Sequence, residues 1–82
     1  MRRIKVYGAD WCGDCIRAKR VLDARNVGYE WIDVDVQAGA AQEALEAARG
    51  RRNIPVVVFP DGSVLVEPTS PELEKALDRQ PA

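Results

Sequence analysis

Four short stretches of the chain have the apolar or alternating pattern that is typical of strands. They are residues 3–7, 29–34, 54–59 and 63–66. The third is a continuous apolar run with a proline near its start, as expected for a buried strand. Asp61-Gly62 separates the last two stretches and predicts a tight hairpin between them.

Three further segments repeat apolar residues at spacings of three and four, which predicts amphipathic helices. The first covers residues 13–26 and the second residues 41–48, with Gly50 expected at the C′ position of the second. Ser70 can cap the third helix, with Pro71 at its first position.

The predicted order of elements is therefore βαβαββα. A right-handed βαβ crossover makes the first two strands parallel, and the hairpin makes the last two antiparallel. The sequence thus predicts an α/β protein with a mixed four-stranded sheet, flanked by three helices that cover both of its faces.

Composition favours one small globular domain over residues 1–82. Twelve basic and 13 acidic residues give a net charge of -1, and 46% of residues are hydrophobic. This balance argues against a nucleic-acid partner, and no apolar run approaches the ~20 residues of a membrane span. Without a signal-like segment before the first predicted strand, we expect a cytoplasmic protein without a membrane partner, and a monomer.

The chain has two cysteines, Cys12 and Cys15, and no histidine. A CxxC closes too short a loop to stabilise a fold much, so a structural disulfide is not expected. The pair also supplies only half of a tetrahedral zinc site, so we expect no metal. A dimer that binds metal through four cysteines from two chains is an alternative that spectroscopy can test.

The position of the cysteines, where a strand ends and a helix begins, favours redox chemistry. The helix N-terminus stabilises a Cys12 thiolate, and Cys15 shares the inward face of the helix, which predicts one exposed and one sheltered sulfur. Cys12 is then the nucleophile and Cys15 the resolving thiol. Gly13 between them lets another backbone approach closely. The alternative is that both cysteines are only small hydrophobic residues.

Three segments together resemble the glutaredoxin branch of the thioredoxin superfamily: residues 7–15, residues 53–55 and the Asp61-Gly62 hairpin. Shorter motifs are similar to the mycoredoxins of actinobacteria and to related redoxins, including those that serve ribonucleotide reductase. These motifs are Trp11-Cys12-Gly13, residues 61–65 and Pro68-Thr69-Ser70. The similarity covers essentially the whole chain.

The resemblance implies a thioredoxin-like fold and a dithiol-disulfide oxidoreductase. No bound cofactor is implied beyond a redox-active Cys12-Cys15 disulfide, with a low-molecular-weight thiol as co-substrate. The implied clients are protein disulfides or mixed disulfides. The alternatives are a redoxin that takes electrons from a thioredoxin reductase for ribonucleotide reductase, and a non-catalytic binding module on the same fold.

The resemblance also implies a substrate-binding surface. Ile54-Pro55 would be a cis peptide beside the cysteines, and the backbone of Ile54 would pair with the substrate. Trp11 would form an apolar wall beside the reactive sulfur, unless it is an ordinary core tryptophan. Arg51 and Arg52 would hold a substrate carboxylate, unless they lie on a solvated loop.

Two positions depart from the glutaredoxin pattern. Residues 66–70 replace the Gly-Gly pair that glutathione-binding relatives carry after the fourth strand, which argues against glutathione as the co-substrate. Within this segment Thr69 and Ser70 contact substrate or simply cap the last helix. Asp14, between the cysteines, opposes a Cys12 thiolate and predicts a weaker oxidant than a relative with a neutral residue there.

Overall fold

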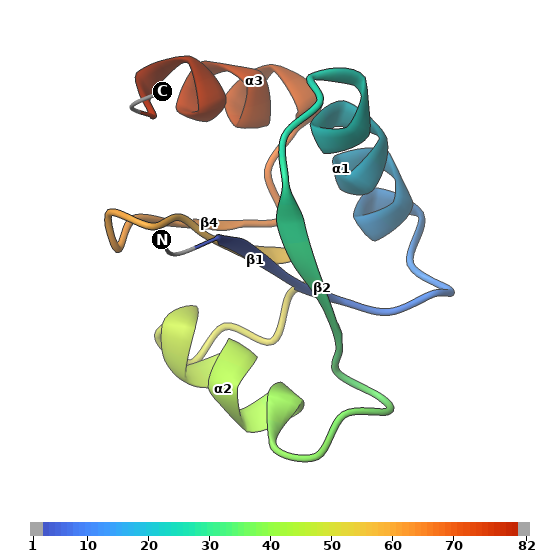
Figure 1. Ribbon diagram of the computed structural model, residues 1–82. Coiled ribbons are helices and arrows are strands. Elements are labelled where there is room, and N and C mark those ends of the chain that lie inside the picture. The colour runs from blue at the N-terminus through green and yellow to red at the C-terminus, as the bar shows by residue number, and fades with distance from the viewer. Residues whose placement is uncertain (1–2, 81–82) are drawn as a thin grey trace.

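Four strands form one mixed sheet with the order β2-β1-β3-β4 (Figure 1). The structure is a computed structural model that describes residues 3–80. In chain order the elements are β1 (Ile4–Gly8), α1 (Gly13–Ala24), β2 (Tyr29–Asp33), α2 (Ala40–Ala47), β3 (Val56–Val58), β4 (Val64–Val66) and α3 (Ser70–Arg79). β1 pairs parallel with β2 and antiparallel with β3, and β3 pairs antiparallel with β4. The predicted fold class, the order of elements and the two predicted strand pairings are confirmed.

The sheet lies between two helical layers, with α1 and α3 on one face and α2 on the other (Figure 1). Because side chains alternate along a strand, the central strand β1 contributes to both cores. Val6 packs with Leu22 of α1 and Leu73 of α3, whereas the next residue, Tyr7, packs with Ala44 of α2. No helix within residues 3–80 is long and apolar enough to cross a membrane.

Two predicted helix caps are shifted by one residue, and α1 ends two residues before the predicted end at residue 26. The N-cap of α3 is Thr69 and not Ser70, because Thr69 and Glu72 form a reciprocal capping box in which each side chain accepts a hydrogen bond from the other's backbone N–H. At the end of α2 the left-handed C′ residue is Arg49 (φ 55°), and Gly50 follows it at C″, where its N–H donates to the Leu45 carbonyl at 2.8 Å.

The third strand is shorter than the apolar run that predicted it. Pro55 has no N–H to donate to the sheet, so pairing begins at Val56. At the other end Phe59 already closes the hairpin, with its N–H 2.9 Å from the Ser63 carbonyl. The turn therefore has three residues, and Gly62 takes the left-handed conformation (φ 91°) that this loop length requires.

Candidate active site

Cys12 is the N-cap residue of α1, where the first turn of the helix leaves backbone N–H groups unpaired. Its Sγ accepts a hydrogen bond from the N–H of Cys15 at 3.2 Å, and its carbonyl accepts the N–H of Ile16 at 3.1 Å. An N–H donor and the positive end of a helix dipole are the interactions that stabilise a negative sulfur. The local sequence places Cys12 there because Gly8 ends β1 and the helical spacing begins at Gly13.

Cys15 lies one helical turn further into the protein and is fully buried. Burial is the main reason that its pKa is raised from 9.0 to about 12, and the hydrogen bond with Cys12 adds to the shift. Both thiols are free. Cys12 is only 8% exposed, so the prediction of an openly exposed sulfur is wrong, although Cys12 is the more accessible of the two.

The loop before β3 covers Cys12. The thiol of Cys12 donates to the carbonyl oxygen of Ile54, with Sγ and O 3.9 Å apart, and the Ile54-Pro55 peptide bond is cis, as the resemblance implied. Ile54 also packs against the small apolar cluster of Ala9, Cys12 and Cys15. A backbone segment 42 residues away in sequence therefore lies directly beside the sulfur.

The two tryptophans take different positions around the cysteines. The interpretation of Trp11 as a core residue is wrong, since its side chain is 72% exposed. Its indole Nε1 donates to the carboxylate of Asp35 at 2.7 Å, which holds it against the loop after β2. Trp31 on β2 is instead the partly buried tryptophan, and it packs against the small cluster of Ala9, Cys12 and Cys15. No local sequence signal marked either Asp35 or Trp31.

The two glycines near the cysteines also differ in their surroundings. A Cβ on Gly13 would meet nothing within 4 Å, so the space in front of this residue is open to an approaching chain. A Cβ on Gly8 would lie 2.8 Å from the sulfur of Cys15 and 2.6 Å from the Trp31 ring. Gly8 therefore makes room for the buried sulfur, a role that its predicted place at the end of a strand did not indicate.

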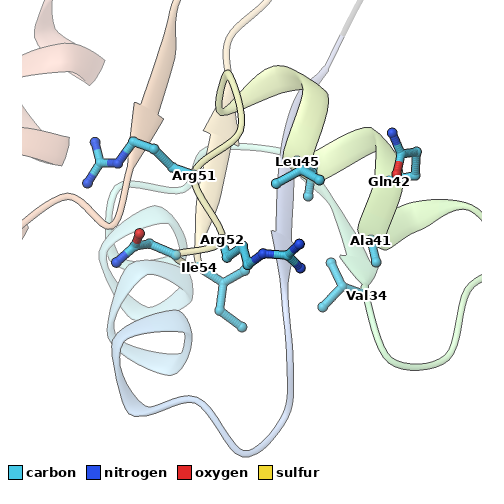
Figure 2. Close-up of a pocket in the computed structure, with 9 residues that line it drawn as sticks. Val34, Ala41, Gln42, Leu45, Arg51, Arg52 and Ile54 are labelled. Carbon is cyan, nitrogen blue, oxygen red and sulfur yellow. The ribbon is translucent and has the colours of Figure 1, made fainter.

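Arg51 and Arg52 are exposed on the loop between α2 and β3, and neither forms an ion pair within residues 3–80. They line a pocket of about 210 Å³ whose other lining residues are Val34, Ala41, Gln42, Ala44, Leu45, Asn53 and Ile54. Figure 2 shows that Arg52 extends across this pocket toward Val34, whereas Arg51 points to the opposite side. The pocket is adjacent to Cys12 through Ile54, which contributes to both sites.

The remaining residues of the predicted site have structural partners. Thr69 uses its side chain and its backbone N–H in the capping box of α3, which leaves Ser70 in the first turn of that helix. Asp14 forms an ion pair with Arg17 one turn along α1, so its charge beside Cys12 is partly compensated. No group of three or more Cys, Asp or Glu side chains that could hold a metal is present in the described part of the chain.

Comparisons with known proteins agree with this geometry. The family model for glutaredoxin matches residues 4–65. A Mycobacterium tuberculosis protein that is named provisionally as a glutaredoxin is 34% identical over 90% of this chain and 88% of its own. Mycoredoxin 1 of Corynebacterium glutamicum is 30% identical over 89% of this chain and 90% of its own.

The solved structure of the glutaredoxin-like NrdH-redoxin from Escherichia coli, a protein described as having a thioredoxin-like activity profile, superimposes with a TM-score of 0.75. It is 31% identical to this chain, and the match covers 99% of each of the two chains. Fold, family match and relatives all agree, and the chain belongs to the glutaredoxin family of the thioredoxin superfamily.

Proposed function

We propose that this protein is a thiol-disulfide oxidoreductase in which Cys12 is the nucleophile and Cys15 the resolving thiol. One observation carries the proposal: the sulfur of Cys12 caps α1 and accepts the N–H of Cys15, while the sulfur of Cys15 is buried one turn behind it. This arrangement supports a division of roles in which one sulfur meets the substrate and the other acts only within the protein. A purely non-catalytic binding module would not need two cysteines in these different positions.

The proposed reaction has two exchange steps. The Cys12 thiolate attacks a substrate disulfide, forms a mixed disulfide, and releases the first substrate sulfur as a thiolate. Cys15 then loses its proton to solvent and attacks the Cys12 sulfur, which forms the Cys12-Cys15 disulfide and releases the second substrate sulfur. The substrate gains the two electrons that the protein loses, so no cofactor is needed beyond the cysteine pair.

The surroundings of Cys12 support a substrate chain that lies between two walls. We assign the backbone of Ile54, next to cis-Pro55, as the edge that pairs with the substrate. Trp11 is assigned to the other side, where it is exposed and held by Asp35. The open space in front of Gly13 leaves room for the substrate backbone.

A small thiol is the proposed co-substrate. The pocket beside Ile54 carries two arginines that form no ion pair within residues 3–80, of which Arg52 extends across it, and a guanidinium donates hydrogen bonds to the oxygens of a small thiol. We expect Arg52→Met to raise the KM for the small thiol by about fivefold, in the range of one ordinary hydrogen bond, and Arg51→Met to change it less. Equal effects of the two substitutions would contradict the assignment.

Residues 66–70 favour a thiol other than glutathione, such as mycothiol, which the likeness to a mycoredoxin also supports. A second candidate reductant is a thioredoxin reductase, because the NrdH-redoxin relative is described as thioredoxin-like in activity. Turnover should be measured with mycothiol, glutathione and thioredoxin reductase in parallel. Efficient turnover with the reductase alone would assign the protein to the redoxins that serve ribonucleotide reductase.

Two cysteine variants test the mechanism itself. Cys15→Ser should retain activity on a mixed disulfide between a protein and a small thiol, because free thiol can resolve the intermediate. Cys12→Ser should be inactive on every substrate. Activity in Cys12→Ser, or a wild-type protein that turns over no disulfide with any of the three reductants, would refute the proposal. We place this activity in the cytoplasm, where thiols are kept reduced.

A further inference from the structure

The buried sulfur of Cys15 rests against a wall formed by two strands. A Cβ built on Gly8 of β1 would lie 2.8 Å from this sulfur and 2.6 and 2.9 Å from atoms Cη2 and Cζ3 of Trp31 on β2. Side-chain carbons do not approach other atoms this closely, so the sulfur and the indole share the space that the missing side chain leaves. The wall therefore depends on a glycine at position 8 and a large aromatic ring at position 31.

Lys19 holds the indole from the helix side. Its Nζ lies 4.1 Å from the centroid of the Trp31 ring, which is the geometry of a cation-π contact. Lys19 follows Cys15 by four residues in α1, so the two side chains project from the same face of the helix. The helix thus carries both the sulfur and the residue that fixes the ring beside it.

We propose that Trp31, fixed by Lys19 and accommodated by Gly8, is a positioning residue for the resolving step of the reaction proposed above. Resolution requires the sulfur of Cys15 to come within bonding distance of the sulfur of Cys12, about 2.05 Å in a disulfide. The wall blocks movement of the Cys15 sulfur toward the sheet. The sulfur can therefore move only toward Cys12. Attack by Cys12 on a substrate uses none of these residues.

The two steps can be separated with the chromogenic disulfide 5,5′-dithiobis(2-nitrobenzoate). Attack by Cys12 releases one coloured thiolate at a rate that depends on the reagent concentration. Attack by Cys15 on the Cys12 mixed disulfide then releases the second coloured thiolate, at a rate that does not depend on the reagent concentration. Stopped-flow absorbance of the reduced full-length protein measures both phases, and unfolding in urea checks that each variant is folded.

Trp31→Leu removes the ring and is expected to slow the second phase by about tenfold, while the first phase stays within about twofold of wild type. Gly8→Ala is expected to slow the same phase, because its added carbon displaces the sulfur or the ring. Lys19→Met should slow it by about threefold, and Lys19→Arg should restore it, since an arginine also binds an aromatic face. Arg20→Met is the matched control on the exposed side of the helix.

An unchanged second phase in the folded Trp31→Leu or Gly8→Ala variant would overturn the inference. Equal slowing of both phases would also overturn it, because a general loss of structure acts on attack and resolution alike. Failure of the proposed function gives a different result: wild type would release a single thiolate, as the Cys15→Ser variant does.

Discussion

The buried thiol of Cys15 predicts that the reduced protein loses stability in mild alkali. Burial raises its pKa from 9.0 to about 12, so the folded state keeps the thiol neutral while the unfolded state ionises. A folded pKa above the unfolded value stabilises the protein below pH 9, and this stabilisation is lost as the pH rises from 9 toward 12. Between pH 8 and pH 11 the contribution falls by about 2 to 3 kcal/mol. That is a large fraction of the stability of a small domain.

The assay is equilibrium unfolding in urea, in the presence of a phosphine reductant, for the wild type and Cys15→Ala across this pH range. Tyr7 and Tyr29 also have raised pKa values, mainly from burial, and they titrate in both proteins. Their effect cancels in the difference between the two free energies of unfolding. We expect the free energy of unfolding of the wild type minus that of Cys15→Ala to fall by about 2 to 3 kcal/mol with rising pH. A difference that stays constant would refute the assignment of the alkaline loss to Cys15.

Three further outcomes are expected. Asp14→Tyr removes a carboxylate beside the cysteines and should make the reduction potential less negative by about 10 to 30 mV in redox equilibrium with a thiol buffer; an unchanged or more negative value contradicts this. Thr69→Ala should lower the free energy of unfolding in urea by about 1 kcal/mol and Ser70→Ala by less, so equal losses would disprove the assigned cap. Alkylation of the reduced protein at neutral pH should modify Cys12 first by mass mapping, and prior labelling of Cys15 would reverse the roles.

The local pattern of the sequence was sufficient for the order of elements, the parallel pairing of the first two strands, the antiparallel pairing of the last two, and the place of the cysteines at a helix start. These features depend on hydrophobic periodicity and on turn residues that act over a few positions. The errors at helix caps are also local, because each cap is shifted by a single position. Thr69 replaces Ser70 as the cap because the carboxylate of Glu72 reaches back to its N–H, and Arg49 takes the left-handed position expected of Gly50.

The tertiary structure decided which residues surround the cysteines. The two tryptophans are equally apolar in the sequence, yet Trp11 is exposed and Trp31 packs against the cluster that contains the cysteines, because Trp31 lies on a strand of the sheet that α1 covers. Asp35 meets Trp11 across 24 residues, and Ile54 meets Cys12 across 42. Such contacts depend on how strands and helices pack against one another, and local periodicity says which face of an element is buried but not which side chains it meets there.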